Sequence, residues 1–400
     1  MAIADSSNVE FNPYAYEAHE DPYPIYAELR EKAPLYRNNE FDFWAISRHA
    51  DVLSAFRNIA KFSNANGVSL DPSAYGPDAP RTMSFLAMDP PRHTRMRTFV
   101  GKGFSPRMVA GMEQRIREIT LEHLEPALEM GTFDFISDFA GRVPMDVISE
   151  IIGVPRVDRP ELRRLADLVV HREEGLFDVP QVGQEAALDL VVYYADMVAQ
   201  RRAKPEDDMT SGLIAAEIDG ERLTDEEIIA VLFLMVVAGN ETTTKLLGNA
   251  WFWGSRNPDQ LVKPFADESA IPLWVEETIR YDGSSQMVAR VTREPVVVQG
   301  QEIPAGERVV LLIGSANRDA EVFDDPDRYN IERDTSKMVS FGGGRHFCMG
   351  APLARLEARI ALEELTRRIG SYEIDGDGAK RVHSINVRGF ESLPTTVEVR

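Results

Sequence analysis

The single cysteine of the chain, Cys348, stands in the stretch F-G-G-G-R-H-F-C-M-G at residues 341–350. A lone cysteine is usually a small buried hydrophobe. Here a helix-like stretch, A-P-L-A-R-L-E-A-R, follows it. The free N–H groups and positive end of that helix would lower the pKa of the thiol, and thiolate is the form that binds metals. The three glycines allow the backbone to approach a flat ligand closely. Cys348 is therefore a candidate metal ligand.

A second candidate site follows the apolar run V-L-F-L-M-V-V-A at residues 231–238. The next residues place Glu241 and Thr242 beside a mid-helix glycine, Gly239. Thr242 can return its hydroxyl to a backbone carbonyl one turn earlier, and Gly239 leaves room for another group to approach. A helix end that emerges into water explains these polar residues equally well. The functional alternative is a cleft in which a carboxylate and a hydroxyl pass protons.

Two further pairs have helical spacing. Glu277 and Arg280 are at i, i+3 in E-E-T-I-R, and an exposed surface pair is the default explanation. His93 and Arg97 are at i, i+4 in D-P-P-R-H-T-R-M-R. They are two donors suited to a carboxylate, although a solvated basic face is an equal alternative. Each pair gains weight only in combination with the other motifs.

A long helix must position the second candidate site. The sequence T-D-E-E places Thr224 at the N-cap and Glu227 at the third helical position, which is a capping box ahead of an apolar run. The core of this helix is apolar on every side, so it is predicted to be buried all round and to extend past residue 245.

The remaining pattern predicts a mainly α protein with small strand regions segregated towards its two ends. One domain over residues 1–400 is the simplest organisation, because no repeat, low-complexity tract or obvious boundary occurs. The predicted helices lie within 13–34, 107–250 and 351–369, and the predicted strands lie within 41–47 and 294–313.

Composition excludes several classes of function. The 400 residues contain 44 Lys and Arg against 65 Asp and Glu, and the net charge of −21 opposes binding to nucleic acids or anionic membranes. One cysteine cannot form an internal disulfide or a multi-cysteine zinc site. The N-terminal M-A-I-A-D-S-S-N-V-E lacks the features of a signal peptide, and the longest apolar run, 228–238, is about half a membrane span. A cytoplasmic location without a membrane span is predicted.

Taken together, these motifs resemble the cytochrome P450 family, in its soluble bacterial and actinobacterial form, over nearly the whole chain. The three matches occur in the family's order. The cysteine-loop motif is met by Phe341, Gly344, Cys348 and Gly350, the groove motif by Ala238, Gly239, Glu241 and Thr242, and the Glu-x-x-Arg motif by Glu277 and Arg280. One departure is visible, because Ser284 follows R-Y-D-G where the family usually has proline.

The resemblance implies the cytochrome P450 fold, a triangular helix-rich prism of the α+β class with haem between the long buried helix and the helix after the cysteine loop. Haem b (iron protoporphyrin IX) would take the Cys348 thiolate as its axial ligand, with Ala238 and Gly239 beside the haem. Glu241 and Thr242 would relay the protons consumed when O2 is cleaved. The implied partners of the haem propionates are His93, Arg97, Arg290 and His346.

The resemblance also implies a monooxygenase that inserts one atom of O2 into an apolar molecule by hydroxylation or epoxidation. Because no flavin- or NAD-binding segment is evident, electrons from NAD(P)H would arrive through a separate ferredoxin and its reductase, and the protein would act as a monomer. The basic residues predicted to dock an acidic ferredoxin are Arg95, Lys102, Arg345 and Arg355.

The predicted substrate pocket is apolar throughout, which favours a lipid, terpenoid or sterol-like molecule over a sugar or nucleotide. Its predicted lining residues are Phe85, Leu86, Leu234, Val237, Met287, Val288 and Phe390.

Three alternatives remain open from the sequence. A haem-thiolate protein could bind a ligand or gas without turnover, although Glu241 and Thr242 argue against it. The protein could use peroxide in place of reductase-driven electrons. Cys348 could be an acyl-transfer nucleophile, but His346, two residues away, has no evident arrangement as its base.

Overall fold

The computed structural model describes residues 9–400, so most of the N-terminal stretch on which the signal-peptide prediction rests lies outside the described residues. Its central element is α12 (Asp225–Arg256), which begins at Thr224 as predicted. The Thr224 hydroxyl accepts from the Glu227 N–H at 3.2 Å, and the Glu227 carboxylate accepts from the Thr224 N–H at 3.1 Å, which completes the capping box. Among residues 9–400, α12 is the one helix long and apolar enough to cross a membrane, yet 67% of its most apolar window is buried inside the protein.

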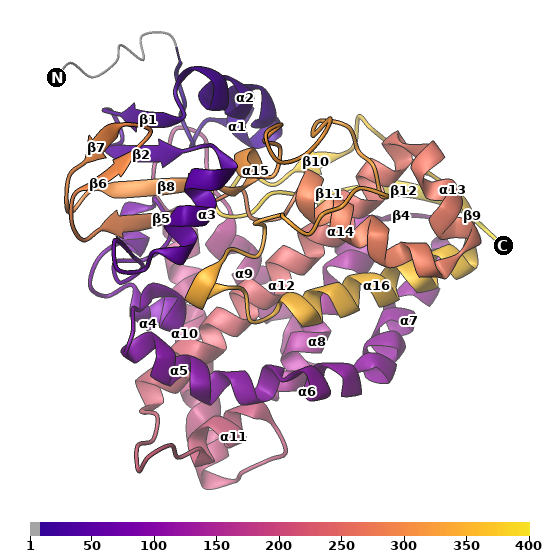
Figure 1. Ribbon diagram of the computed structural model, residues 1–400. Coiled ribbons are helices and arrows are strands. Elements are labelled where there is room, and N and C mark those ends of the chain that lie inside the picture. The colour runs from indigo at the N-terminus through magenta and orange to yellow at the C-terminus, as the bar shows by residue number, and fades with distance from the viewer. Residues whose placement is uncertain (1–8) are drawn as a thin grey trace.

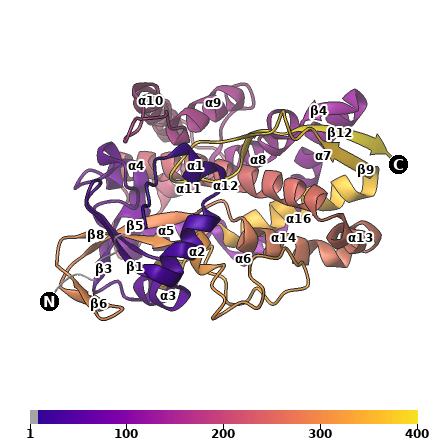
Figure 2. The ribbon, with the colours of Figure 1, turned by 90° about the horizontal axis from the view of Figure 1, so that it is seen from above.

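The other helices pack around α12 (Figures 1 and 2). Those in direct contact with it include α8, α9 and α10 from the middle of the chain and α14 and α16 from its last third. The helices are α1 (Tyr16–Glu20), α2 (Tyr23–Lys32), α3 (His49–Arg57), α4 (Pro80–Met83), α5 (Arg92–Val100), α6 (Pro106–Gly111), α7 (Glu113–Met130), α8 (Arg142–Ile152), α9 (Arg159–Val170), α10 (Gln181–Ala203), α11 (Met209–Ala215), α13 (Pro258–Ala266), α14 (Ile271–Tyr281), α15 (Ile313–Ala316) and α16 (Ala351–Arg368).

The largest sheet joins segments that are far apart in sequence. Its order is β1-β2-β8-β5-β3, and β2 pairs with β8 in parallel, with Trp44 opposite Val309. The sheet lies at one end of the molecule (Figure 1). Its strands are β1 (Leu35–Asn38), β2 (Phe43–Ile46), β3 (Phe62–Ser63), β5 (Met287–Thr292) and β8 (Arg308–Leu312).

Three smaller sheets complete the architecture. The sheet β4-β12-β9 contains a strand that the sequence pattern missed, because β4 (Thr132–Asp134) lies inside the stretch predicted to be helical. Three residues are too few to leave a period-two signal, and β4 exists by pairing with the C-terminal β12. The remaining strands are β6 (Val296–Val298), β7 (Gln301–Ile303), β9 (Ile369–Ile374), β10 (Lys380–Arg381), β11 (Phe390–Ser392) and β12 (Pro394–Val399). The mainly α architecture with small separate sheets agrees with the prediction.

Candidate functional site

An open cavity, which measures about 1580 Å3 when the solvent at its mouth is included, lies between α12 and the segment that contains Cys348 and the start of α16. Residues from α12 form one wall, among them Ala238, Gly239 and Thr242. Cys348 and Leu353 lie on the other wall. The two motifs that are about 100 residues apart in the sequence therefore face the same space.

The cysteine loop is a tight turn that needs glycine. The Cys348 N–H donates to the Phe341 carbonyl at 2.9 Å. Gly344 has φ +63°, and a Cβ there would lie 2.8 Å from the Phe56 carbonyl oxygen, so a larger residue is excluded by both strain and space. Arg97 braces the loop by donating from Nη2 to the Phe347 carbonyl at 2.6 Å.

The acidity of Cys348 differs from the sequence-based expectation. Cys348 faces the cavity, and the surrounding protein atoms desolvate its sulfur, which raises the pKa of the thiol above its usual range. The N–H groups of Gly350 and Ala351 and the Arg97 guanidinium act in the opposite direction, as expected for a helix start. Their effect is smaller than that of desolvation, so the pKa of the thiol lies above its usual range despite the helix that follows it.

Four basic side chains lie close together near the cavity, and none of them forms an ion pair with a carboxylate of residues 9–400. The rings of His93 and His346 are 4.0 Å apart between centroids. Both ring nitrogens of His93 and Nε2 of His346 are buried without a hydrogen-bond partner in the described chain. Arg290 is buried, and its Nη1 donates to the Ala289 carbonyl at 2.7 Å. The fourth member is Arg97, which lines the cavity.

Burial sets the pKa values of this cluster. It lowers the pKa of His93 to about 4 and that of His346 to about 3, with further lowering by their cationic neighbours. Burial also lowers the pKa of Arg290 to about 10, partly opposed by Asp89. Orphaned buried donors are costly. A ligand that brings two carboxylates would satisfy them, so these residues fit the propionates of a haem.

The polar stretch after the apolar run does not end the helix, because α12 continues to Arg256. The Thr242 hydroxyl donates to the Ala238 carbonyl at 2.8 Å, one turn earlier, as the sequence predicts. Gly239 lines the cavity, and a Cβ at this position would also lie 3.2 Å from Ile148 of α8. Glycine here therefore permits close packing of α8 as well as access from the cavity.

Glu241 turns away from the cavity lining and is buried against α9. Its Oε2 lies 3.3 Å from Lys245 Nζ, and its Oε1 accepts from Asn240 Nδ2 at 3.0 Å. Burial acts to raise the pKa of Glu241, but Lys245 and a hydrogen bond with Asp167 outweigh it and lower the pKa. For Asp167, burial and the charge of Glu241 raise the pKa to about 8. The sequence gives no signal for Asp167, because its partner Glu241 lies more than 70 residues away.

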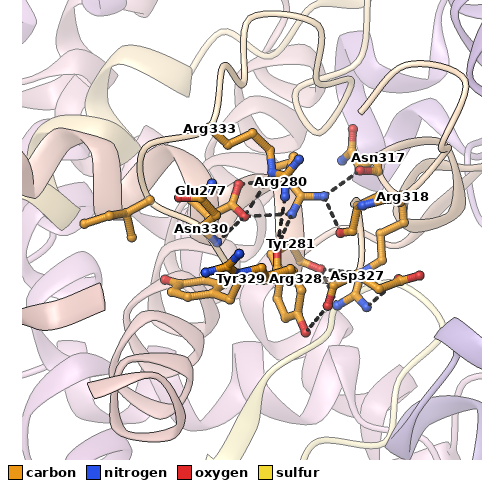
Figure 3. Close-up of polar contacts among 12 residues, drawn as sticks. Glu277, Arg280, Tyr281, Asn317, Arg318, Asp327, Arg328, Tyr329, Asn330 and Arg333 are labelled. Carbon is orange, nitrogen blue, oxygen red and sulfur yellow. Dashed lines mark hydrogen bonds and ion pairs between the residues drawn. The ribbon is translucent and has the colours of Figure 1, made fainter. Parts of the chain in front are cut away.

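Glu277 and Arg280 form a buried pair, and the surface-pair explanation is wrong (Figure 3). Arg280 donates to Glu277 in a bidentate arrangement at 2.8 and 2.7 Å. The Asn330 N–H donates to the same carboxylate at 2.9 Å, and Arg280 also donates to the carbonyls of Asn317 and Pro326. The pair thus fastens α14 to the segment 317–333 that precedes the cysteine loop.

Four of the seven residues predicted to line the substrate pocket lie on the wall of this cavity, and three do not. Phe85, Leu86, Leu234 and Val288 line the cavity. The three residues that lie outside its lining are Val237, Met287 and Phe390.

The geometry of each element explains these three differences. Met287 packs into the cluster beneath β1 and β2 because consecutive side chains of a strand alternate between faces, and Val288 takes the cavity face. Val237 packs beside Val387 on another face of α12. Phe390 packs on Phe252 with ring centroids 4.7 Å apart.

Helical spacing could have found some of the lining residues that were missed. Leu234, Ala238, Thr242 and Leu246 all line the cavity at intervals of four residues. This i, i+4 ridge identifies Leu246 and excludes Val237. No comparable signal exists for residues that arrive from distant elements. These include Val68, Phe104, Ile148, Ser284, Ile313 and Glu357.

Only part of the basic patch predicted to dock ferredoxin is free of ion pairs within residues 9–400. Arg95 donates to Glu221 at 2.6 Å and to Glu227 at 3.0 Å, and Arg355 forms a bidentate pair with Glu276. Lys102 and Arg345 are exposed and make no ion pair with another residue of 9–400.

Comparison with known proteins identifies close relatives. The family model described as Cytochrome P450 matches residues 271–373. A protein of Mycobacterium tuberculosis named cytochrome P450 123 is 57% identical over 390 residues, with 97% of each chain covered. The vitamin D(3) 25-hydroxylase of Pseudonocardia autotrophica is 36% identical, with all of both chains covered. The crystal structure of CYP109E1 from Bacillus megaterium in complex with testosterone superposes with a TM-score of 0.88 at 31% identity and covers 96% of this chain and 99% of that one.

Proposed function

Because the chain belongs to the cytochrome P450 family of monooxygenases, we propose that it oxidises a hydrophobic lipid, terpenoid or sterol-like molecule, with electrons from a separate ferredoxin and its reductase. The observation that carries the proposal is the cavity in which Cys348, four basic donors and the Thr242 turn converge. The reaction places one atom of O2 in the substrate and the other in water. We also propose a cytoplasmic monomer as the working form.

Haem fits the residues of this cavity. Cys348 would hold the iron through its sulfur, and His93, Arg97, Arg290 and His346 would bind the two propionates. When bound, haem with a thiolate ligand activates O2 for insertion into a C–H or C=C bond. The positive end of α16 and the Arg97 guanidinium favour the charged form of the cysteine sulfur.

Thr242 and Glu241 would manage the protons of the reaction. The Thr242 hydroxyl lies on the cavity wall, where it can hold a hydrogen bond to a ligand or water. Glu241 lies one residue before it, charged and paired with Lys245. Asp167, whose pKa is raised by burial and by the charge of Glu241, would hold a proton more readily than a free carboxyl group and pass it to Glu241.

The cavity supports an apolar substrate. Its wall carries aromatic and aliphatic side chains from several separate segments, including Phe85, Leu234, Leu246 and Val288. Such a lining excludes water from a hydrophobic molecule and offers a sugar few hydrogen-bond partners. The names of the relatives point the same way, since one hydroxylates vitamin D(3) and the solved structure holds testosterone.

Lys102 and Arg345 are the two exposed cations that best suit an acidic ferredoxin. Charge reversal at both positions should raise the ferredoxin concentration needed for half-maximal reduction, with the effect greatest at low salt. Charge reversal at Arg95 is the control. It should change this ferredoxin concentration less, because the Arg95 guanidinium is already paired with Glu221 and Glu227.

Reconstitution tests the proposal. Purified protein with ferredoxin, reductase and NAD(P)H should oxidise at least one member of a panel of lipids, sterols and terpenoids that first shifts its absorption spectrum. NAD(P)H consumption at background with every such compound would favour the ligand-binding alternative. Faster product formation with hydrogen peroxide than with O2 and reductant would favour the peroxide-using alternative.

A further inference from the structure

Ser284 occupies the turn after α14 and reaches across to the catalytic turn of α12. Its Oγ donates to the backbone carbonyl of Thr242 at 2.6 Å. That carbonyl lies within α12, so its second lone pair accepts this bond in addition to the bond of the helix. A proline at position 284 has no hydroxyl and could not make the contact.

The donor comes from a firmly held segment. The Asp282 carbonyl accepts from Asn249 Nδ2 at 2.7 Å, and the Ser284 carbonyl accepts from the Arg388 N–H at 2.7 Å. Gly283 packs against the carbonyl of Ile279, where a Cβ would approach to 2.5 Å. The Ser284 hydroxyl therefore has little freedom to follow a moving partner.

The hydrogen bond from Ser284 acts on the turn of α12 that contains Thr242. Asn249, two turns further along α12, already binds the 282–284 segment. Without the Ser284 hydroxyl, the hydrogen bonds between this segment and α12 would be those of Asn249 and Trp253 to Asp282, two and three turns beyond Thr242. The Thr242 hydroxyl points back to Ala238, so both polar groups of Thr242 are held.

We infer that Ser284 is a positioning residue that keeps the Thr242 turn in register with the cavity, through its hydrogen bond to the Thr242 carbonyl. The inference rests on the proton-handling role proposed for Thr242. It predicts that loss of the Ser284 hydroxyl lowers the share of reducing equivalents that reach the product. Because Ser284 also lines the cavity, substrate affinity is measured separately.

The test measures peroxide released per NAD(P)H in the reconstituted holoenzyme, with the spectral dissociation constant of one substrate. Ser284→Ala should raise peroxide release by up to about fivefold, the population change that one neutral hydrogen bond can produce. Ser284→Thr keeps a hydroxyl and should behave like the wild type. Ser255→Ala is the control for loss of a serine hydroxyl that donates to a carbonyl of α12, because Ser255 bonds the Phe252 carbonyl within the helix itself, far from the groove.

Amide hydrogen exchange gives a second readout that does not depend on turnover. Exchange across residues 242–249 should be faster in Ser284→Ala than in Ser255→Ala. Equal exchange in the two variants would overturn the positioning role of Ser284. Thr242→Ala separates the two proposals. If Thr242→Ala releases peroxide and Ser284→Ala stays coupled, the positioning role fails and the role of Thr242 stands. If Thr242→Ala itself stays coupled, the proposed role of Thr242 fails, and the inference fails with it.

Discussion

The cluster around Glu277 and Arg280 and the cluster around His93 and His346 both bury ionisable side chains, but only the first supplies each of them with a partner. Glu277 accepts from Arg280 and from the Asn330 N–H, while both ring nitrogens of His93 lack a partner within residues 9–400. A satisfied buried pair holds segments together, whereas orphaned donors favour binding of a ligand with the missing acceptors. The contrast separates the scaffold of the site from its binding surface.

The largest expected effect on folding comes from a substitution in the Glu277–Arg280 cluster. Glu277→Ala leaves the Arg280 guanidinium buried without its carboxylate, which costs about 3–5 kcal/mol of folding free energy. Little or no holoprotein should be recovered, as measured by soluble yield and the ratio of haem to protein.

The neighbouring Glu276→Ala provides the control. Glu276 pairs with Arg355 at the surface, where both side chains are partly exposed. This variant should change stability by about 0–1 kcal/mol and retain haem. Normal holoprotein from Glu277→Ala would mean that the buried pair does not hold the scaffold.

The next largest effect is expected on iron ligation in the cavity, without loss of the fold. Cys348→Ser removes the sulfur that would ligate iron, so the red-shifted absorption band of the reduced carbon monoxide complex should disappear. The far-UV circular dichroism should stay at wild-type values, because Cys348 donates only its backbone N–H to the loop. An unchanged band would rule out Cys348 as the axial ligand.

His93→Phe sharpens the comparison by removing an orphaned donor. Since neither ring nitrogen has a partner, the apoprotein should lose no stability, and its unfolding midpoint should stay the same or rise. Loss of a donor to a charged propionate should speed haem release by at least about tenfold, measured by transfer to an acceptor protein.

His123→Phe is the matched variant for a histidine that has its partner. His123 Nε2 lies 2.8 Å from Asp146 Oδ2. This substitution should lower the unfolding midpoint without changing haem release. A large loss of apoprotein stability in His93→Phe instead would show that His93 belongs to the scaffold.

The smallest effect is a pH dependence. Folding raises the pKa of Asp167 from its ordinary 3.8 to about 8, through burial and the charge of Glu241. The folded state then binds this proton more tightly than the unfolded chain, so the contribution of Asp167 to stability is present at low pH and is lost as pH rises towards 8. The wild type should lose free energy of unfolding relative to Asp167→Asn between about pH 5 and 8 in denaturant titrations.

The contribution of Asp89 to stability has the opposite pH dependence, so Asp89 is the reference for Asp167. Burial acts to raise the pKa of Asp89, but hydrogen bonds from Ser63, Asn64 and Arg293 lower it. Its contribution to stability is therefore present above its ordinary pKa and is lost as the solution becomes more acidic. A constant difference between wild type and Asp167→Asn over the same range would contradict the raised pKa of Asp167.

The sequence predicted those features that depend on neighbours within one or two helical turns. The capping box at Thr224, the return of the Thr242 hydroxyl to Ala238 and the limits of α16 all arise from such local contacts. Residue type and spacing are sufficient for these interactions because both partners lie on one helix. The cysteine, groove and Glu-x-x-Arg motifs were found in the same way.

Tertiary structure alone decided which distant residues each of these local features contacts. Burial by distant elements made Glu277 and Arg280 an internal pair. Desolvation of the Cys348 sulfur raised the pKa of that thiol despite the helix that follows it. The pairing of Asp167 with Glu241 and the bond from Ser284 to Thr242 join elements that the sequence separates by more than 40 residues. Desolvation and long-range hydrogen bonds depend on which atoms fold into contact, and spacing along one helix contains no information about atoms that arrive from another.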